Sequence, residues 1–339
     1  MKNAIIFGGS GFIGGFFAKH LIENCSYNKI YILDIESPAD KESSFRRNQF
    51  LELKDKISFV ECDVRKSINW FPNEPIELIA NFAAIHREPG HKDYEYFETN
   101  IKGAENVCEW ATKISCKSII FSSSISPYGI EDFEKNEESL PVPSTAYGSS
   151  KLVAEKIHIN WQEKNIQDRT LVIVRPGVVF GPGEGGNVSR LIKAIKKRYF
   201  VYIGNQKIRK AGVYVKELSN AMTWCLNKAA ASESKIVLFN MTMNPGPSIE
   251  EYANAILKVL NKNYFFPRLP FSLLLLAAHL ISLICWPLGI KHPFSPVRII
   301  KLKRANEINP KFLIDNNYKF LFDLDNALLD WKKDCPQEW

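Results

Sequence analysis

The sequence of 339 residues has little that would support a fold built on disulfides or metal ions. Its seven cysteines are an odd number and none are spaced as C-x-x-C, so we expect neither a disulfide scaffold nor a metal site. Its 18 glycines are too few for a collagen-like chain, and 45% apolar residues are too many for a disordered one. The first residues hold one lysine and then a strand-like run, which is not the layout of a signal peptide. These absences predict a globular protein of a reducing, cytoplasmic compartment.

Short apolar runs alternate with longer amphipathic stretches through the first half of the chain. The runs are apolar throughout, as strands covered on both faces are. They are Asn3–Phe7, Ile30–Leu33, Ile57–Val60, Leu78–Phe82, Ser118–Ser122 and Leu171–Val174. The alternation predicts an α/β fold with a doubly wound, parallel sheet of Rossmann type.

The alternation ends after about Phe180, where Gly181–Gly186 contains four glycines and a proline. We predict a nucleotide-binding domain over residues 1–180, with its sheet completed by residues 211–245. Residues 181–339 would then form mainly a smaller, substrate-binding domain.

Glycines recur at every third position directly after the first strand-like run. Gly8–Gly14 reads G-x-x-G-x-x-G and opens a predicted helix, whose free N–H groups and tight turn suit a pyrophosphate. Asp34 ends the next run, where a carboxylate holds ribose hydroxyls and repels a 2′-phosphate, so NAD is favoured over NADP. Small or acidic residues also end the third and fourth runs. The predicted cofactor-binding residues at these strand ends are Gly8, Gly11, Phe12, Ile13, Gly14, Asp34, Asp63, Val64, Ala83 and Ala84.

A tyrosine and a lysine lie four residues apart after the proline-containing loop Pro141–Ser144. Tyr147 and Lys151 would share one face of a helix. The ammonium, with the positive charge of a nicotinamide, is expected to lower the pKa of the tyrosine and let it act as a base. The serine run Ser122–Ser124 ends another strand-like run and offers a hydroxyl to the same substrate oxygen.

Together these motifs resemble the extended short-chain dehydrogenases/reductases of the NAD-dependent epimerase/dehydratase family. The resemblance covers most of residues 1–260 and rests on GGSGFIG, Asp34, FSSSISPYG, YGSSK and RPGVVFGPG. It implies a tyrosine base, a lysine that binds ribose, a serine that assists, and NAD as cofactor. A dehydratase is not expected, because Ile125-Ser126 stands where 4,6-dehydratases carry Asp-Glu. The implied catalytic residues are Tyr147, Lys151, Ser124 and, as second choice, Ser123, and further implied cofactor contacts are Pro176 and Val178.

The resemblance also bears on the substrate. AAIHREP, FGPGEGGNVSRL and PFSPVRIIKL are similar to bacterial epimerases that act at C4 of N-acetylglucosamine on undecaprenyl diphosphate. The run Ser189–Lys210 holds eight Lys/Arg and no acid, which favours an anionic ligand; the net charge of +7 is too mild to indicate nucleic-acid binding. The implied substrate-binding residues are His86, Ser124, Asn187, Lys210 and Arg298.

The segment Phe271–Trp286 is unusually apolar, with thirteen apolar residues of sixteen, and five Lys/Arg follow it. Sixteen residues are short for a spanning helix, which needs roughly 20. Two interpretations of residues 271–290 stay open: a helix lying in the membrane interface beside a cationic patch, or a buried helix or dimer contact.

We therefore expect an NAD-dependent C4 epimerase of an N-acetylhexosamine carried on undecaprenyl diphosphate or UDP, acting through a 4-keto intermediate in surface-polysaccharide biosynthesis. Alternatives are an NAD(P)H-dependent 4-ketoreductase of a nucleotide-linked 4-keto-6-deoxy amino sugar, a 3β-hydroxysteroid-type dehydrogenase, and a non-catalytic NAD-binding protein. By analogy we expect a homodimer, and peripheral contact with the inner face of the cell membrane.

Overall fold

The computed structural model describes residues 2–41, 43–88, 90–130, 133–285 and 306–339. Its centre is a seven-stranded sheet with the order β10-β6-β5-β4-β1-β2-β3, and all neighbouring strands are parallel. The predicted doubly wound sheet of Rossmann type is thereby confirmed. Its strands are β1 (Lys2–Phe7), β2 (Tyr27–Asp34), β3 (Ile57–Glu61), β4 (Leu78–Asn81), β5 (Ser118–Ser122), β6 (Thr170–Pro176) and β10 (Ile236–Met241).

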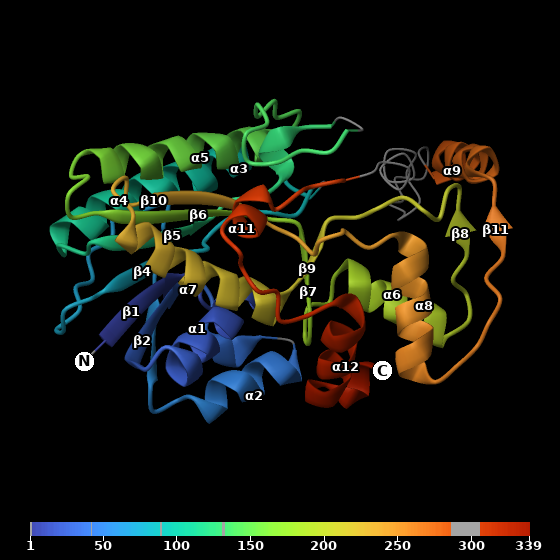
Figure 1. Cartoon of the computed structure of the whole chain (residues 1–339), viewed down its shortest axis with the longest axis horizontal. Helices are drawn as coiled ribbons and strands as arrows, with labels where there is room; N and C mark the ends of the chain where they lie inside the picture. Colours follow the sequence, from blue (N-terminus) through green and yellow to red (C-terminus); the bar gives the residue numbers. More distant parts are fainter. Residues whose placement is uncertain (1, 42, 89, 131–132, 286–305) are drawn as a thin grey trace.

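Helices cover both faces of this sheet, as Figure 1 shows. Successive side chains of a strand point to opposite faces. Ala4 and Ile6 of β1 accordingly join one buried cluster and Ile5 and Phe7 join another. This explains why the strands are apolar throughout rather than alternating. The helices on one face are α1 (Phe12–Asn24), α2 (Ser44–Glu52) and α7 (Val215–Ala231), and those on the other are α3 (Asp93–Tyr96), α4 (Lys102–Lys113) and α5 (Ala146–Glu163).

A third buried cluster joins the segments that follow the sixth strand of the sheet. In this cluster the Phe180 ring contacts the rings of Tyr214 and Trp331, with ring centres 5.7 and 6.2 Å apart. The elements around it are β7 (Val178–Phe180), α6 (Asn187–Lys196), β9 (Gly212–Tyr214), α8 (Ile249–Leu260) and α12 (Leu324–Asp334). These elements lie beyond the carboxyl ends of the strands of the sheet (Figure 1). The division of the chain into two domains remains a prediction.

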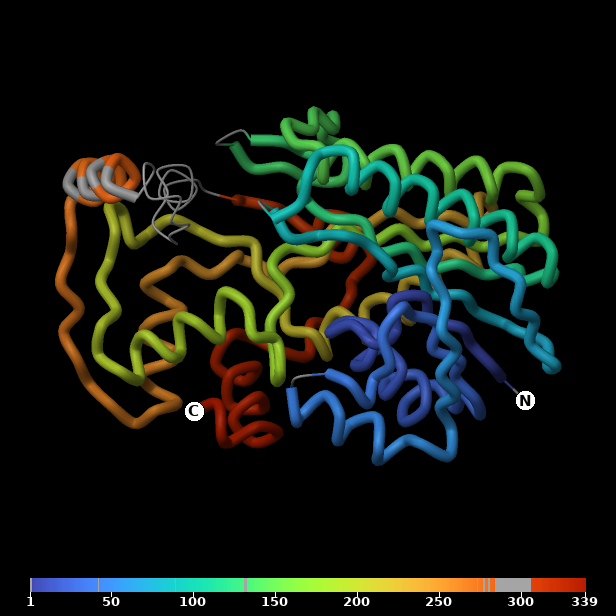
Figure 2. The backbone as a smooth tube through the Cα atoms, turned by 180° about the vertical axis from the view of Figure 1, so that it is seen from behind, coloured from blue at the N-terminus to red at the C-terminus, as the bar shows by residue number. Residues whose placement is uncertain are grey.

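A long apolar helix, α9 (Phe271–Cys285), lies at the end of the molecule farthest from the N-terminus (Figures 1 and 2). It follows the short pair of strands β8 (Tyr202–Ile203) and β11 (Arg268–Leu269). Leu276 and Leu283 are 58% and 69% exposed, whereas Ala278 is buried. Among the described residues, no helix has the length and hydropathy needed to cross a membrane. The rest of the predicted segment 271–290 lies outside the described residues.

Backbone hydrogen bonds hold the carboxyl ends of four central strands together. Phe82 N donates to Phe7 O (2.9 Å), Ser123 N to Val174 O (2.7 Å), and Ile125 N to Pro176 O (3.2 Å). Parallel strands share the direction of their carboxyl ends, so the loops that follow them meet at one edge of the sheet. This edge brings the predicted site residues together.

Candidate active site

The glycine-rich loop joins β1 to α1 and touches the loop after β4. Gly8 adopts φ +70°, and a Cβ there would come within 2.6 Å of Ala83 N. A Cβ on Gly14 would come equally close to Gly8 O. Only glycine fits such approaches, so the spacing predicted from the sequence has a steric cause. Phe12 and Ile13 are the first two residues of α1, and Ala84 follows Ala83 in the touching loop.

The start of α1 has the polar groups that a dinucleotide needs. Its N-cap, Gly11, offers no side-chain acceptor to the N–H groups of the first turn, which suits them to a bound anion. The Ser10 hydroxyl is buried and has no hydrogen-bond partner among the described residues. An orphaned buried donor of this kind points to an external acceptor. The loop therefore fits a pyrophosphate.

Asp34, the last residue of β2, lies against this loop. Its Oδ2 accepts from Ser10 N (3.0 Å) and its Oδ1 from Ile35 N (2.8 Å). Burial raises the pKa of Asp34, against the opposing effects of Lys41 and of backbone N–H groups. Its place at the end of the strand beside the glycine loop suits it to ribose hydroxyls.

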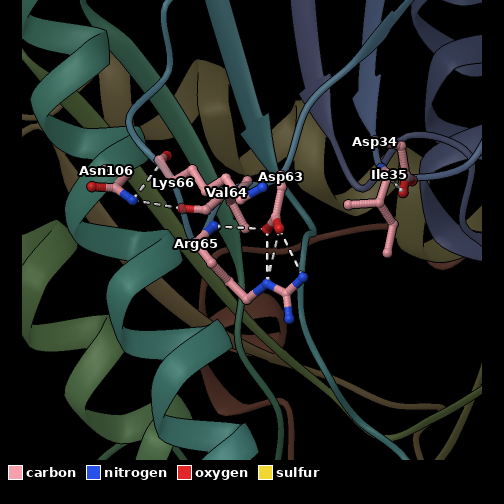
Figure 3. A network of polar contacts seen from close by, with 7 residues as sticks. All are labelled: Asp34, Ile35, Asp63, Val64, Arg65, Lys66 and Asn106. Atoms are coloured by element: carbon pink, nitrogen blue, oxygen red, sulfur yellow. Dashed lines mark hydrogen bonds and ion pairs between the residues drawn. The ribbon is translucent and has the colours of Figure 1, made fainter.

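The residues after β3 form the polar network in Figure 3. Asp63 accepts from the Arg65 guanidinium at 2.7 and 2.9 Å, and this interaction holds the pKa of Asp63 below its usual value. Asn106 Nδ2 donates to Val64 O (2.7 Å) and Lys66 O (3.0 Å), which anchors the loop to α4. Arg65 and Asn106 were not identified from the sequence, where nothing in their spacing marks them.

Tyr147 and Lys151 lie in the first two turns of α5, as expected. Thr145 caps this helix by accepting from Gly148 N (3.1 Å). Lys151 is buried, with its ammonium 4.5 Å from the centre of the Phe121 ring. Burial lowers the pKa of Lys151 to about 7, and the charge of Glu155 opposes that effect.

The structure separates the two serine candidates after β5. Ser124 hydrogen-bonds Tyr147, and its Oγ also lies 3.1 Å from the Ser126 hydroxyl. Ser123 donates its hydroxyl to Glu155 instead. Of the two hydroxyls, that of Ser124 is therefore the one on the tyrosine side.

Burial raises the pKa of Tyr147 to about 12, although the hydrogen bond with Ser124 opposes the rise. The charges of Glu88 and Tyr96 raise it further. The cause of this rise is that removal from water disfavours a phenolate. The lowering expected at Tyr147 needs the positive charge of a nicotinamide in addition to Lys151, and it stays a prediction.

His86 belongs to the loop after β4 and lies close enough to Lys151 to be affected by its charge. Burial is the main cause of its lowered pKa, and the charges of Arg87 and Lys151 lower it further. Asn100 fixes this loop, because its amide bonds both backbone groups of Ile85 and the Ser150 hydroxyl of α5. Pro176 ends β6 beside Ile125, and Val178 begins β7.

The remaining substrate candidates are spread more widely. Asn187 is exposed at the start of α6, where its Oδ1 accepts from Arg190 (2.7 Å). The first N–H groups of α6 donate to Glu184 rather than standing free. Burial lowers the pKa of Lys210, which pairs through its backbone with the strand-like segment at Asn306. Arg298 lies outside the described residues.

A pocket of about 220 Å³ is lined by residues that flank Ser124 and Tyr147 in the chain. Ser126 and Tyr128 of η3 (Ser126–Tyr128) line it together with Thr145, the cap of α5. The segment Asn306–Ile308 also lines it, and its Glu307 O accepts a hydrogen bond from Lys135 N. The pocket thus joins residues that neighbour the Tyr147–Ser124 pair to a segment from the C-terminal part of the chain.

Comparison with known proteins identifies a family. Residues 4–240 match the family model described as "NAD dependent epimerase/dehydratase family". An N-acetyl-alpha-D-glucosaminyl-diphospho-ditrans,octacis-undecaprenol 4-epimerase of Escherichia coli O157:H7 is 26% identical over 88% of this chain and 85% of its own length. A sterol-4-alpha-carboxylate 3-dehydrogenase of Candida albicans is 23% identical over 98% of this chain and 97% of its own.

Among solved structures, the fold resembles a UDP-glucuronic acid 4-epimerase from Bacillus cereus in complex with NAD. The TM-score is 0.72, with 18% identity, and the match covers 99% of each chain. At that identity the likeness shows the fold, which extends over the described sheet and the elements beyond it.

Proposed function

The chain belongs to the NAD dependent epimerase/dehydratase family and uses NAD as its cofactor, and on that premise we propose that it epimerises C4 of an N-acetylhexosamine carried on a diphosphate. The observation that carries the proposal is the hydrogen bond between Ser124 and Tyr147, which adjoin the pocket-lining residues Ile125 and Thr145 in the chain. This pair would let a base and an assisting hydroxyl act on one substrate oxygen. The proposed carrier is undecaprenyl diphosphate, as in the name of the Escherichia coli relative, and the proposed pathway is surface-polysaccharide assembly.

The residues around the glycine loop would hold the cofactor. The α1 N–H groups and the Ser10 hydroxyl would bind its pyrophosphate, and Asp34 its adenosine ribose. Lys151 would bind the nicotinamide ribose. When bound, NAD supplies the hydride acceptor and donor and, in its oxidised form, a positive charge beside Tyr147.

The protein's own part is to move one proton and hold one oxygen. As a phenolate, Tyr147 takes the proton of the C4 hydroxyl while Ser124 hydrogen-bonds that oxygen. The sugar, now a 4-ketone, turns over in the pocket and presents its other face. Tyr147 then returns the same proton to the oxygen, so no net proton or reducing equivalent is consumed.

His86, Asn187 and Lys210 are proposed to bind the substrate. The lowered pKa of Lys210 reflects partial burial, which strengthens its attraction for a phosphate. His86 lies beside Lys151, at the reacting end.

Contact with a membrane is part of the proposal, because a polyprenyl carrier stays in the bilayer. On α9, Leu276 and Leu283 are exposed, and Phe265, before β11, is 89% exposed. Phe265 follows Tyr264, whose ring centre lies 4.3 Å from Arg198 and 5.9 Å from Lys262. Exposed apolar residues and cations are the side chains that suit an anionic lipid surface. We call Leu276 and Leu283 the α9 patch.

The test is an epimerisation assay with no NAD added. It offers UDP-N-acetylglucosamine and undecaprenyl-diphosphate-N-acetylglucosamine side by side and scores the C4 epimer. Conversion of the lipid-linked sugar alone is the expected result. Conversion of UDP-N-acetylglucosamine alone would replace the proposed carrier, and stoichiometric consumption of NADH on a 4-keto sugar, with no epimerisation, would replace the epimerase with a ketoreductase. Oxidation of a 3β-hydroxysteroid with neither sugar converted would move the assignment to the sterol branch of the relatives.

A further inference from the structure

A buried ion pair lies beneath the candidate active site. Glu155 of α5 and Arg175 of β6 are 1% and 3% exposed. Arg175 Nε donates to Oε1 of Glu155 (2.8 Å) and Nη2 donates to Oε2 (2.6 Å), which is the two-pronged geometry of a strong pair. Charges are rarely buried this deeply unless both are satisfied, so the pair must be explained.

The pair connects both sides of the site. Glu155 lies one helical turn after Lys151 and two after Tyr147, and it accepts a hydrogen bond from the Ser123 hydroxyl. Ser123 adjoins Ser124. Arg175 precedes Pro176, whose carbonyl accepts from Ile125 N on the other side of Ser124.

The contacts continue to the pocket wall. The Arg175 guanidinium lies 4.7 Å from the centre of the Tyr128 ring, and Tyr128 lines the pocket. The Tyr128 hydroxyl in turn donates to Asn240 Oδ1 of β10 (2.9 Å). The ion pair therefore holds α5, the ends of β5 and β6 and the pocket wall at fixed separations.

We propose that Glu155 and Arg175 are positioning residues that hold Ser124 and the Tyr147–Lys151 pair in register across the substrate oxygen. Neither touches that oxygen, so neither is a catalytic residue. The kinetic part of this inference rests on the proposed function, but its structural and electrostatic part does not. A displacement of about 1 Å between a base and its partner can cost roughly a hundredfold in rate.

The same geometry gives Glu155 an electrostatic effect on Lys151. Its carboxylate raises the pKa of the ammonium, against burial. The other titratable groups that affect or adjoin Lys151 are Tyr147 and His158 on α5 and His86 after β4. Burial lowers the pKa of both histidines, that of His158 to about 4, so both are neutral at neutral pH.

Glu155→Gln tests the proposal, with Glu217→Gln as the matched control. Glu217 is equally buried (2% exposed) but lies on α7, where it accepts from Leu321 N and Phe322 N (both 2.7 Å). We expect Glu155→Gln to lower kcat roughly 10- to 100-fold with KM nearly unchanged. Arg175→Lys, which keeps the charge, should lose less than Arg175→Met. Glu217→Gln should leave kcat and KM unchanged.

The readout that needs no substrate is the titration of Lys151 in the NAD-bound enzyme. It is followed through the lysine 13Cε shifts of labelled protein and assigned with Lys151→Met. Glu155→Gln should move this titration to lower pH, and Glu217→Gln should not. An unchanged titration and unchanged kcat in Glu155→Gln would overturn the proposal, whereas failure of the sugar assay alone would overturn only the proposed function.

A second variant covers the case in which Glu155→Gln does not fold because Arg175 is left unpaired. The double variant Glu155→Gln/Arg175→Met removes both charges and so leaves no uncompensated one. It should fold, show the same downward shift of the Lys151 titration and keep the loss of kcat. A double variant with wild-type kcat would show that the pair only supports the fold.

Discussion

Two ends of the molecule depart from the usual distribution of side chains in opposite directions. At the carboxyl edge of the sheet, Glu155 and Arg175 are almost fully buried, whereas in the α9 patch Leu276 and Leu283 are more than half exposed. Buried charge and exposed apolar surface both disfavour the folded, dispersed protein. The contrast teaches that the two unfavourable features lie where different chemistry is proposed. The buried charges lie beneath the site of proton transfer, and the exposed leucines lie where contact with lipid is proposed.

The largest effect is expected from removing Tyr147, the proposed base of the candidate active site. Tyr147→Phe removes the phenol hydroxyl and keeps the ring, so it should lower turnover roughly 10² to 10⁴-fold. Epimerisation by the purified variant is the measurement, and the NAD content after purification is the control. Near-wild-type turnover would contradict the role given to Tyr147.

The second effect concerns the exposed end. Removing two leucines from a lipid contact costs roughly 1.5–3 kcal/mol each, so Leu276→Asp/Leu283→Asp should weaken binding to phosphatidylglycerol vesicles by at least roughly a hundredfold. Co-sedimentation with vesicles measures this. Leu329→Asp is the matched control, since Leu329 is 51% exposed on α12, away from the α9 patch.

If the double aspartate variant pelleted with vesicles as the wild type does, the α9 patch would not be a lipid contact. Loss of a dimer in that variant, seen by analytical ultracentrifugation, would then assign the patch to a second copy of the chain. The melting temperature should stay close to the wild-type value, because both side chains are already exposed.

A smaller effect is expected from Asp34, which tests the preference for NAD over NADP. Asp34→Asn removes the charge that repels a 2′-phosphate, so the preference for NAD over NADP should fall about tenfold or more. Competition binding of the two cofactors to enzyme stripped of NAD measures it. Asp63→Asn should leave the preference in place because Asp63 is already paired with Arg65. Equal shifts in both variants would argue against a specific role for Asp34.

The last effect concerns Glu184, which caps α6. Burial raises its pKa to about 7, from 4.5 when unfolded. The folded state therefore binds the proton more tightly, and between pH 4.5 and 7 this group makes the free energy of unfolding fall as the pH rises. Glu184→Gln should flatten that dependence by about 3 kcal/mol, in urea unfolding at several pH values. A stability that instead rose with pH in the wild type but not in the variant would contradict this sign.

Local features of the site could be predicted because their causes are local. Gly8 and Gly14 must be glycines for steric reasons within one turn, and the spacing of Tyr147 to Lys151 places them on one helix face. The strands were found because burial on both faces makes them apolar throughout. The resemblance ranked Ser124 above Ser123, but the contact that separates them, from Ser123 to Glu155, lies on another element and has no local cause.

The sequence contains one signal of the ion pair, namely the charged residue Arg175 within an apolar strand. Arg175 is the lone charge in the apolar run Leu171–Pro176, and a charge in a buried strand needs a partner. The partner could not be identified from the sequence, because Glu155 is one of several acids on nearby helices. The size of the burial effect that opposes the expected lowering of the Tyr147 pKa was also out of reach, since desolvation depends on everything packed around the phenol.

By itself the sequence determined the doubly wound sheet, the nucleotide loop, the tyrosine–lysine helix and the presence of an apolar segment near the C-terminal end. These follow from periodicity, steric limits on glycine and helical spacing, which act over a few residues. Only the tertiary structure decided that Ser123 bonds Glu155, that Glu155 and Arg175 lie beneath the site, and which leucines of α9 remain exposed. Those outcomes depend on burial and on hydrogen bonds between distant segments, and a chain acquires both only when it packs.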